Sequence, residues 1–477
     1  MLIFEPTNQL KLLKQLNVRS FNTNSAYIEP NDVFVCKVGA NLDGHNYAAH
    51  AIANGAIAVI SNREMNLSVP TLVTESYEQS LDLIKSVLDH PYRLMKHIGV
   101  TGTNGKTTVA HCLNQIMNIH TNSAYIGTLG ANIGGIERPL DNTTPDAVTL
   151  LTLFNDMKKA NTSFNMMELS SHALIQKRAD FISLQVGVIT NIGYDHIDFH
   201  KTPEDYVQAK LNIIDRLADN AHLVVNLNDP HAAAAIDKAR DRVNVITFGV
   251  ENNQADLIAT DIESTLTGTC FTLSLMGEAK KVELPMPFDF NVENALSIAA
   301  TLVAFDWTIG RISSALGSIH PPEGRSQFVP LHNGAMGLVD FAHNADAIEK
   351  LLSEAKKHTR SKLLVVLGVT GDRIQQAGQI GAICHNYADI VIYTSDNPMG
   401  VDQKDLFNAL TSGSDKQSYT EADRESAIRL AKQLSGKGDL ILVCGKGNET
   451  YQYTTSGKTT KISYIGDAAA LRLPQII

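Results

Sequence analysis

Gly99-Val-Thr-Gly102-Thr-Asn-Gly105-Lys106-Thr107-Thr108 is the stretch of the chain that decides the fold. The apolar run His97–Thr101 predicts a short strand that enters this stretch, and the residues after it have a helical pattern. Glycines let the backbone turn tightly, so that successive N–H groups face a phosphate at the positive end of the following helix. This order of strand, glycine-rich turn and helix predicts an α/β domain that binds a nucleotide.

Lys106 and Thr107 give the turn its expected chemistry. The lysine neutralises charge on the β- and γ-phosphates, and the threonine hydroxyl is offered to Mg²⁺. The strict P-loop spacing is missed by one residue, because Gly99 lies six positions before Gly105. The competing interpretation is a glycine-rich turn that binds nothing, and the Gly-Lys-Thr-Thr sequence argues against it.

Apolar β-type runs alternate with helical stretches on both sides of this turn, which favours α/β units with parallel sheets. Strands are predicted at 32–38, 56–61, 97–101, 165–168, 183–191, 221–228, 243–249, 362–368, 389–395 and 439–444, and a helix at 47–54. Joints are expected at Pro91-Tyr92 and at His320–Gly324. The predicted domains are therefore 1–91, 92–320 and 321–477, and three domains also suit a chain of 477 residues.

Composition and charge exclude several classes of protein. Forty Lys and Arg stand against 50 Asp and Glu, a net charge of −10 with no basic block, so nucleic acid and anionic membranes are not expected partners. No signal peptide and no apolar run long enough to span a bilayer are evident. No heptad or exposed repeat favours assembly, so a monomer is expected.

The cysteines point to a reducing compartment. They are five in number, never spaced as Cys-x-x-Cys, and therefore predict neither a disulfide framework nor a zinc knuckle. Their positions are Cys36, Cys112, Cys270, Cys384 and Cys444. The sequence thus predicts a soluble, cytoplasmic protein.

Polar side chains follow two of the predicted strands, Glu168 after one and His196 after another. Ligand sites in parallel sheets gather beyond the carboxyl ends of the strands. Both side chains and the phosphate turn are therefore expected to converge on one Mg²⁺ that bridges ATP and an acceptor. By itself, a histidine such as His196 is more often a structural hydrogen bonder than a metal ligand, and the helical pattern around Lys210 favours a solvated helix lysine.

A series of sequence elements occurs in the order typical of the Mur ligase family. They are 99–108, Asn-Thr-Thr-Pro at 142–145, Glu-Leu-Ser-Ser-His at 168–172, Asp195-His196, Lys210, Asn-Val-Glu-Asn at 291–294, Asp-Phe-Ala-His at 340–343, and Gly-Lys-Gly-Asn-Glu-Thr-Tyr-Gln at 445–452. The chain resembles this family over nearly its full length. Within the family it is most similar to the UDP-N-acetylmuramoyl-tripeptide synthetase (MurE) branch.

The resemblance implies an α/β protein of three domains. A UDP-binding domain comes first, followed by a central ATPase domain with a P-loop-type, mostly parallel sheet, and a Rossmann-like C-terminal domain that binds an amino acid. The implied reaction uses ATP to add an amino acid to UDP-N-acetylmuramoyl-L-alanyl-D-glutamate through an acyl phosphate. This is a step of peptidoglycan precursor synthesis, and the implied cofactors are ATP and Mg²⁺.

The resemblance also implies roles for individual residues. The catalytic residues are Lys106, Glu168, His196 and Lys210; the metal ligands are Thr107, Glu168, His196 and Lys210, the last as a carbamate (N6-carboxylysine). The ATP site comprises Gly102, Thr103, Asn104, Gly105, Lys106, Thr107, Thr108, Asn294, Arg325, Asp340 and His343. The UDP-substrate site comprises Ser25, Asn142, Thr143, Thr144, Ser171, Gln176 and Arg178, and the amino-acid site Arg373, Asp396, Asn397, Met399, Gly445 and Glu449.

Departures from the family pattern leave open which acceptor and which amino acid the protein uses. Met399 stands where diaminopimelate-adding enzymes resembling this chain have an arginine, and Ala26 replaces another arginine near the UDP. Asn344-Ala345 replaces the Thr-Pro of the family pattern, and Asn448 replaces a histidine of that pattern. Two alternatives therefore stay open: a MurE-like paralogue that uses another carboxylate acceptor, and a nucleotide-binding regulatory or scaffold module without catalysis. The retained Lys106, Glu168, His196 and Lys210 argue against the second.

Overall fold

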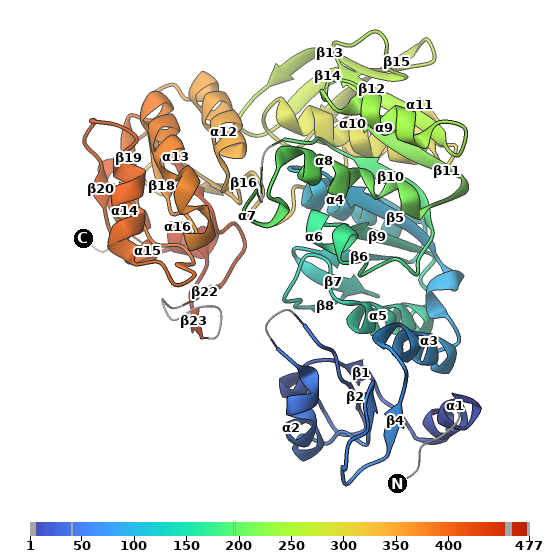
Figure 1. Ribbon diagram of the computed structural model, residues 1–477. Helices are drawn as coiled ribbons and strands as arrows, with labels where there is room; N and C mark the ends of the chain where they lie inside the picture. Colours follow the sequence, from blue (N-terminus) through green and yellow to red (C-terminus); the bar gives the residue numbers. More distant parts are fainter. Residues whose placement is uncertain (1–5, 40–41, 194, 196, 454–459, 475–477) are drawn as a thin grey trace. The chain divides into compact units, whose positions relative to one another are not determined.

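Residues 6–39, 42–193, 195, 197–453 and 460–474 are described by a computed structural model (Figure 1). The α/β class predicted from the sequence is confirmed. Three larger sheets of four, eleven and six strands are each built from one consecutive stretch of chain, and a two-stranded hairpin follows. The predicted boundaries at 91/92 and 320/321 fall between these sheets, and their exact positions stay a prediction.

The first sheet is parallel and has the strand order β1-β2-β3-β4. Its elements are α1 (Pro6–Gln15), β1 (Phe21–Asn22), η1 (Ser25–Tyr27), β2 (Val33–Val35), η2 (Gly44–Tyr47), α2 (Ala48–Ala53), β3 (Ala58–Ser61), β4 (Thr71–Val73), α3 (Tyr77–Val87) and η3 (Pro91–Leu94). Phe34 and Val59 pack with Ala48 and Ala51 of α2 in one buried cluster. The predicted strands and helix of this region are present, with shorter bounds.

The central sheet has the order β15-β14-β13-β12-β11-β10-β5-β9-β6-β7-β8. Its strands are β5 (Lys96–Thr101), β6 (Ser123–Gly127), β7 (Gly130–Ile133), β8 (Ile136–Arg138), β9 (Phe164–Glu168), β10 (Leu184–Ile189), β11 (Leu217–Asn226), β12 (Asn244–Val250), β13 (Leu257–Ser264), β14 (Thr269–Leu275) and β15 (Glu278–Leu284). Its helices are α4 (Lys106–His120), α5 (Ala147–Lys159), α6 (Ser171–Ile175), α7 (Ile197–His200), α8 (Pro203–Leu211), η4 (Ile214–Arg216), α9 (Ala232–Ala239), α10 (Phe290–Val303) and α11 (Ile309–Leu316).

Antiparallel hairpins extend this sheet, and their strands are not among those predicted. The pairs β6–β7, β7–β8, β13–β14 and β14–β15 are antiparallel. Gly134-Gly135 connects β7 to β8 and Met276-Gly277 connects β14 to β15, and all four residues have positive φ, as type I′ hairpin turns require. The Gly-Gly pair is a recognisable hairpin signal, whereas a methionine at such a position is not.

The C-terminal sheet has the order β16-β17-β21-β18-β19-β20 and is parallel except for the β16–β17 pair. Its elements are β16 (Gln327–Pro330), β17 (Met336–Asp340), α12 (Ala345–His358), β18 (Leu363–Leu367), η5 (Gly371–Arg373), α13 (Ile374–Tyr387), β19 (Ile390–Tyr393), α14 (Gln403–Thr411), β20 (Tyr419–Thr420), α15 (Arg424–Leu434), β21 (Leu440–Cys444) and α16 (Asp467–Arg472). The hairpin strands are β22 (Tyr451–Tyr453) and β23 (Lys461–Ser463).

Strand β18 shows why helices cover both faces of this sheet. Leu363, Val365 and Leu367 belong to one buried cluster with α12, α13 and α14, whereas Leu364 and Val366 belong to another with α15 and α16. Successive side chains of a strand point to opposite faces, so a continuous apolar run needs cover on both. The predicted Rossmann-like arrangement of this region is therefore confirmed.

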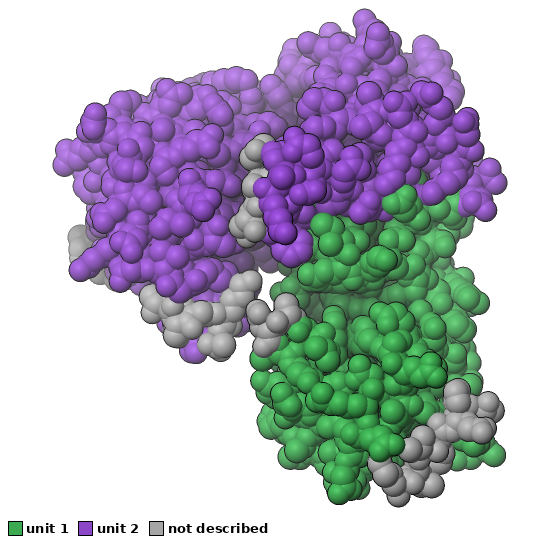
Figure 2. Space-filling model, in the orientation of Figure 1, with its two compact units in different colours: residues 1–99, 117–185, 215–218 green, residues 100–116, 186–214, 219–477 purple. Residues whose placement is uncertain are grey.

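The chain divides into two compact units (Figure 2). One contains residues 1–99, 117–185 and 215–218, and the other contains 100–116, 186–214 and 219–477. The phosphate turn, α8 and the C-terminal sheet belong to the second unit, and the predicted UDP-substrate residues belong to the first. Within the described part of the chain, no helix is long and apolar enough to cross a membrane.

Candidate active site

The phosphate turn connects β5 to α4, and two glycines give it its shape. Gly102 and Gly105 have φ of 152° and 86°. A Cβ on Gly102 would lie 1.9 Å from Oγ1 of Thr190, and one on Gly105 would lie 2.3 Å from Oδ1 of Asn294. Only glycine combines these backbone angles with such close neighbours.

The segment that follows β10 braces the turn from one side. The side chain of Asn191 accepts from Asn104 N at 3.0 Å and donates to Asn104 O at 3.1 Å. Thr103 N donates to Asn191 O at 2.8 Å, and Gly193 N donates to Oγ1 of Thr103, also at 2.8 Å. The backbone of the turn is therefore held before any ligand binds, which lowers the cost of ordering it.

Lys106 folds back over the turn. Its Nζ donates to the carbonyls of Gly102 at 2.8 Å and Thr103 at 3.0 Å. The next residue, Thr107, accepts a hydrogen bond from Nη2 of Arg325 at 3.3 Å. A cation and a hydroxyl are thus close together at the start of α4, as the sequence predicts for a phosphate site.

A cavity of about 740 Å³, including its open mouth, lies beside the turn. It gathers predicted ATP-site residues from three distant stretches: Asn104, Gly105, Thr108, Asn294, Arg325, Asp340 and His343. The other predicted members, Gly102, Thr103, Lys106 and Thr107, complete the turn but do not line the cavity.

The C-terminal wall of this cavity is ordered by Asp340. Its carboxylate accepts from Ser326 N at 2.7 Å and from Ala342 N at 2.8 Å. Burial raises the pKa of Asp340, and the nearby Arg325 opposes that rise. The guanidinium of Arg325 stacks 4.2 Å from the ring centre of Phe341. This wall therefore offers an aromatic ring, a cation and an acid to a nucleotide.

Lys210 is buried beneath the turn, with 2% of its surface exposed. Its Nζ donates to Gly102 O at 2.7 Å and lies 4.5 Å from the ring centre of Tyr206. Burial, and then the charge of Lys106, lower the pKa of Lys210 well below its ordinary value, against the attraction of Asp195. The interpretation of Lys210 as a solvated helix lysine is therefore wrong.

Glu168 ends β9 as a fully buried carboxylate. It accepts hydrogen bonds from the hydroxyl of Tyr125, from Thr128 N at 3.0 Å and from the Thr128 hydroxyl at 3.1 Å. Two of these bonds go to Oε1 and one goes to Oε2. The carboxylate is therefore held rigidly, and its oxygens are of the kind that Mg²⁺ prefers.

The predicted magnesium ligands are only partly described. His196 lies outside the described residues, and those residues contain no cluster of three or more His, Cys, Asp or Glu side chains suited to a metal. The oxygens of Thr107 and Glu168 suit Mg²⁺, which prefers hard ligands. Lys210 fits a cation only as a carbamate, because an ammonium would repel the metal.

The predicted UDP-substrate residues form two groups in the first compact unit. Thr144 accepts from Ser170 N at 3.0 Å, and its carbonyl accepts from Nη1 of Arg178 at 2.6 Å. Nε of Arg178 donates to Gln176 at 2.9 Å, and the Thr143 hydroxyl lies 3.1 Å from that of Thr128. Asn142 is exposed and Ser171 is buried at the start of α6.

Ser25 belongs to the other group, in the N-terminal sheet. Its hydroxyl lies 3.0 Å from Nδ1 of His50, and its carbonyl accepts from Nδ2 of Asn54 at 2.9 Å. Helix α2 therefore positions Ser25. Neither His50 nor Asn54 was predicted from the sequence, since a histidine on a short helix and an asparagine at its C-cap carry no specific signal.

The predicted amino-acid residues surround a lysine that the sequence analysis did not single out. Lys446 is fully buried, and its Nζ donates to Asn397 Oδ1 at 3.2 Å and to Glu449 Oε2 at 3.0 Å. It also pairs with Asp396 at 3.2 Å. Burial raises the pKa of Glu449, and Lys446 opposes that rise. The Gly-Lys-Gly-Asn-Glu motif was the available signal for this lysine.

The remaining amino-acid residues lie on adjoining loops. Gly371 N donates to Asn397 O at 3.0 Å, so the turn with Arg373 adjoins the loop that carries Met399. Met399 is half-buried with φ of 48°, in the left-handed region. Gly445 has φ of 110° and approaches Asp396, whose Oδ2 would lie 2.9 Å from a Cβ there.

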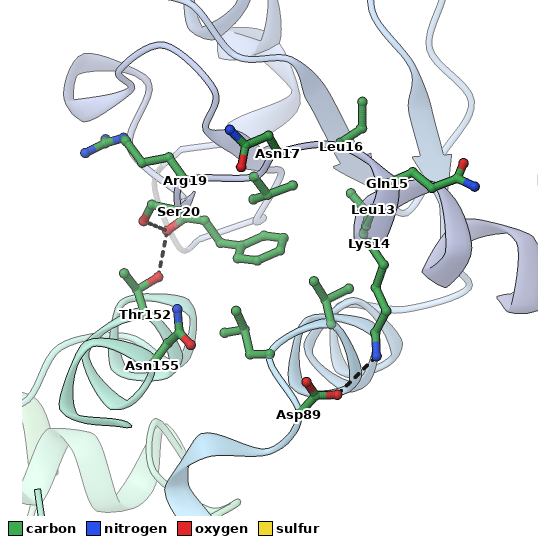
Figure 3. A pocket seen from close by; sticks show the side chains of 14 residues that line it. Leu13, Lys14, Gln15, Leu16, Asn17, Arg19, Ser20, Asp89, Thr152 and Asn155 are labelled. Atoms are coloured by element: carbon green, nitrogen blue, oxygen red, sulfur yellow. Dashed lines mark hydrogen bonds and ion pairs between the residues drawn. The ribbon is translucent and has the colours of Figure 1, made fainter. Parts of the chain in front are cut away.

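A separate cavity of about 1000 Å³, including its open mouth, lies in the first unit, between α1, α3 and α5 (Figure 3). Lys14 and Asp89 form an ion pair at 3.0 Å on its wall, and Thr152 donates to Phe21 O at 3.1 Å. None of the predicted site residues lines it.

Comparisons with known proteins identify the family of the chain. Residues 17–90 match the model of the Mur ligase family catalytic domain, 100–303 the Mur ligase middle domain, and 324–447 the Mur ligase glutamate ligase domain. The chain is similar to proteins named UDP-N-acetylmuramoyl-L-alanyl-D-glutamate--2,6-diaminopimelate ligase. It is 34% identical to that of Bacillus velezensis over 446 residues (91% of this chain, 90% of the relative). It is 34% identical to that of Halalkalibacterium halodurans over 444 residues, with the same coverage.

A solved structure with the same ligase name superimposes with a TM-score of 0.63 at 27% identity, covering 95% of this chain and 94% of the other. Sequence and fold therefore agree along nearly the whole length. The chain belongs to the Mur ligase family of ATP-dependent amide ligases.

Proposed function

We propose that the protein joins an amino acid to UDP-N-acetylmuramoyl-L-alanyl-D-glutamate at the expense of ATP, a step in making the peptidoglycan precursor. The observation that carries the proposal is the cavity beside the phosphate turn, which gathers Asn104, Asn294, Arg325, Asp340 and His343. The names of the relatives supply the acceptor.

The proposed chemistry has two steps. The acceptor carboxylate attacks the γ-phosphorus of ATP, the bond to ADP breaks, and an acyl phosphate forms. The neutral amine of the amino acid then attacks the acyl carbon, phosphate leaves, and the amine loses a proton as the amide forms. Lys106 stabilises the charge on the transferring phosphoryl group.

Magnesium is proposed to be held by Thr107, Glu168, His196 and carbamylated Lys210. When bound, it neutralises phosphate charge. The buried position of Lys210 supports the carbamate, because a desolvated amine that stays neutral can add to CO₂.

The amino acid is proposed to bind at the loops with Arg373, Asn397 and Glu449. An arginine pairs with a carboxylate and a glutamate with an ammonium, which suits an amino-acid zwitterion. Met399 adds a neutral side chain to this site. A distal carboxylate on the amino acid would therefore find no cation at position 399.

We further propose domains at 1–91, 92–320 and 321–477 and a monomer in the cytoplasm. In support, the three sheets are separated at these boundaries, and all five cysteines are free thiols, as a reducing compartment permits.

The test is phosphate release from ATP with UDP-N-acetylmuramoyl-L-Ala-D-Glu, scanned across diaminopimelate, lysine, ornithine and neutral amino acids. Turnover that needs both the acceptor and one amino acid is expected. Silence across the panel, with ATP still bound, would favour a paralogue with another carboxylate acceptor, which Ala26 and Met399 motivate.

The scaffold alternative is tested by Lys210→Ala. A ligase loses turnover in this variant and retains ATP binding, whereas a scaffold has no turnover to lose. Recovery of the inactive variant by a short-chain carboxylic acid, but not by bicarbonate, would support the carbamate.

A further inference from the structure

Asp195 lies on the segment that braces the phosphate turn and contacts the C-terminal region of the same compact unit. Nη2 of Arg373 donates to its Oδ1 at 3.2 Å and to its Oδ2 at 3.4 Å. The two side chains are only 6% and 10% exposed. A charge-assisted contact so shielded from water fixes where the guanidinium lies.

Asn344 adds a second donor to the same carboxylate. Its Nδ2 donates to Asp195 Oδ2 at 3.3 Å, while its Oδ1 accepts from Ala347 N at 2.9 Å as the N-cap of α12. The cap sets the orientation of the amide, so the NH₂ group faces Asp195. Asn344 is 1% exposed, and it adjoins His343 on the wall of the nucleotide cavity.

The other end of this segment holds the phosphate turn. Asn191 is hydrogen-bonded to both backbone groups of Asn104, and Gly193 N to Thr103. Asp195 is two residues beyond Gly193. One short segment therefore contacts both the nucleotide turn and the arginine proposed to bind the amino acid.

Arg373 retains donors for a ligand. A guanidinium has five N–H donors, and Asp195 uses only the Nη2 edge. Among the described residues, neither Nε nor Nη1 of Arg373 has a hydrogen-bond partner. The arginine can therefore pair with Asp195 and with a carboxylate of the amino acid together.

We propose that Asp195 is a positioning residue for the amino-acid site. With Asn344, it orients the guanidinium of Arg373 towards the carboxylate of the incoming amino acid. Because the same segment of the chain is hydrogen-bonded to the phosphate turn, the position of Arg373 depends on the position of that turn. The inference rests on the proposed function, which assigns Arg373 to the amino acid. The opposite role, a competitor that neutralises Arg373, predicts the opposite change in affinity for the amino acid.

The test uses Asp195→Asn in the full chain, with phosphate release measured at saturating ATP and acceptor. KM for the amino acid is expected to rise about tenfold or more, the usual effect of losing a charge-assisted hydrogen bond. KM for ATP is expected to change less than about twofold, since the bonds between Asn191 and the turn remain. Asn344→Ser keeps a capping oxygen but removes the amide NH₂ group that donates to Asp195, and is expected to raise the same KM by a smaller factor.

Asp405→Asn is the matched control, because it makes the same chemical change at an exposed position of α14. An unchanged or lower KM for the amino acid in Asp195→Asn would overturn the proposal. If Asp195→Asn loses ADP binding and thermal stability, Asn344→Ser becomes the test. A wild-type KM for the amino acid in Asn344→Ser, at wild-type stability, would then overturn the proposal. Absence of turnover in the unmodified protein with every amino acid is a different result, and counts against the proposed function.

Discussion

Around the phosphate turn, the backbone angle and the distance to neighbouring atoms restrict which residue each position can hold. Gly105 has φ of 86°, and a Cβ there would lie 2.3 Å from Oδ1 of Asn294. Gly105→Ala must therefore move either the turn or Asn294, and we expect nucleotide affinity to fall at least about tenfold, because a left-handed backbone alone costs about 1–2 kcal/mol. Titration with ADP measures this.

Gly135→Ala is the control for a strained backbone at a position that lines no part of the nucleotide cavity. Gly135 has φ of 81° in the β7–β8 turn, with nothing within 4 Å of a Cβ. It carries the same conformational strain without the collision. Equal loss of ADP affinity in both variants would contradict the argument.

Lys210 gives the protein a defined pH dependence of stability. Its pKa is lowered from 10.5 by burial in the folded state and returns to the ordinary value on unfolding. Between these two pKa values the unfolded chain binds a proton that the folded chain does not, so stability rises with pH across this range. We expect the free energy of unfolding, relative to Lys210→Met, to be lower at pH 7 than at pH 10.

Urea unfolding of both proteins in CO₂-free buffer measures this difference, since a carbamate would change the titrating group. A difference that stays constant from pH 7 to pH 10 would show that Lys210 is not desolvated as described.

At the scale of elements, a buried ion pair holds the loops of the C-terminal sheet. Nε and Nη2 of Arg424, on α15, donate to the two oxygens of Asp467 on α16 at 2.7 and 2.8 Å. Arg424 also donates to the carbonyls of Ser395 and Cys444, at 3.3 and 2.8 Å. These residues immediately precede the two loops that carry Asp396 and Gly445.

Arg424→Met leaves the carboxylate of Asp467 buried without its cation. Removing one partner of such a pair costs about 3–5 kcal/mol, whereas replacing both by apolar groups is often close to neutral. We expect Arg424→Met to be destabilised by about that amount in urea unfolding, and Arg424→Met/Asp467→Leu by less. A double variant less stable than the single one would show that the pair stabilises the fold by itself.

At the scale of the whole molecule, the nucleotide cavity is lined by residues that precede the exposed residue Glu323 in the chain and by residues that follow it. Arg325 and Ser326 line the cavity two and three residues later. Bound nucleotide should restrain this connection and reduce local opening. We expect saturating ADP to slow cleavage after Glu323 by a glutamate-specific protease, measured by mass spectrometry of the fragments.

Glu75 supplies the internal control, because it is exposed on a loop of the first unit and lines no nucleotide cavity. Cleavage there should be insensitive to ADP. Equal protection at both positions would indicate general stabilisation, and no protection at Glu323 would contradict a cavity closed by the C-terminal stretch.

The predictable part of the fold was encoded locally. The apolar runs of β5, β18 and β21 are buried on both faces, so their sequences are unambiguous. The hairpin strand β15, Glu278–Leu284, is largely exposed and charged, and its identity depends on pairing with β14 rather than on its own pattern. Strands of that kind are determined by their partners.

The sequence by itself determined the α/β class, the phosphate turn and, through the order of its motifs, the family resemblance. Only the tertiary structure decided that Lys210 is buried beneath the turn, that Lys446 lies at the centre of the C-terminal loops, and that Asp195 contacts Arg373. The physical reason is the separation along the chain between the residues that interact. A glycine-rich turn or an apolar strand is specified by neighbours along the chain, whereas the burial and charge partner of a lysine or aspartate depend on residues that only folding brings near.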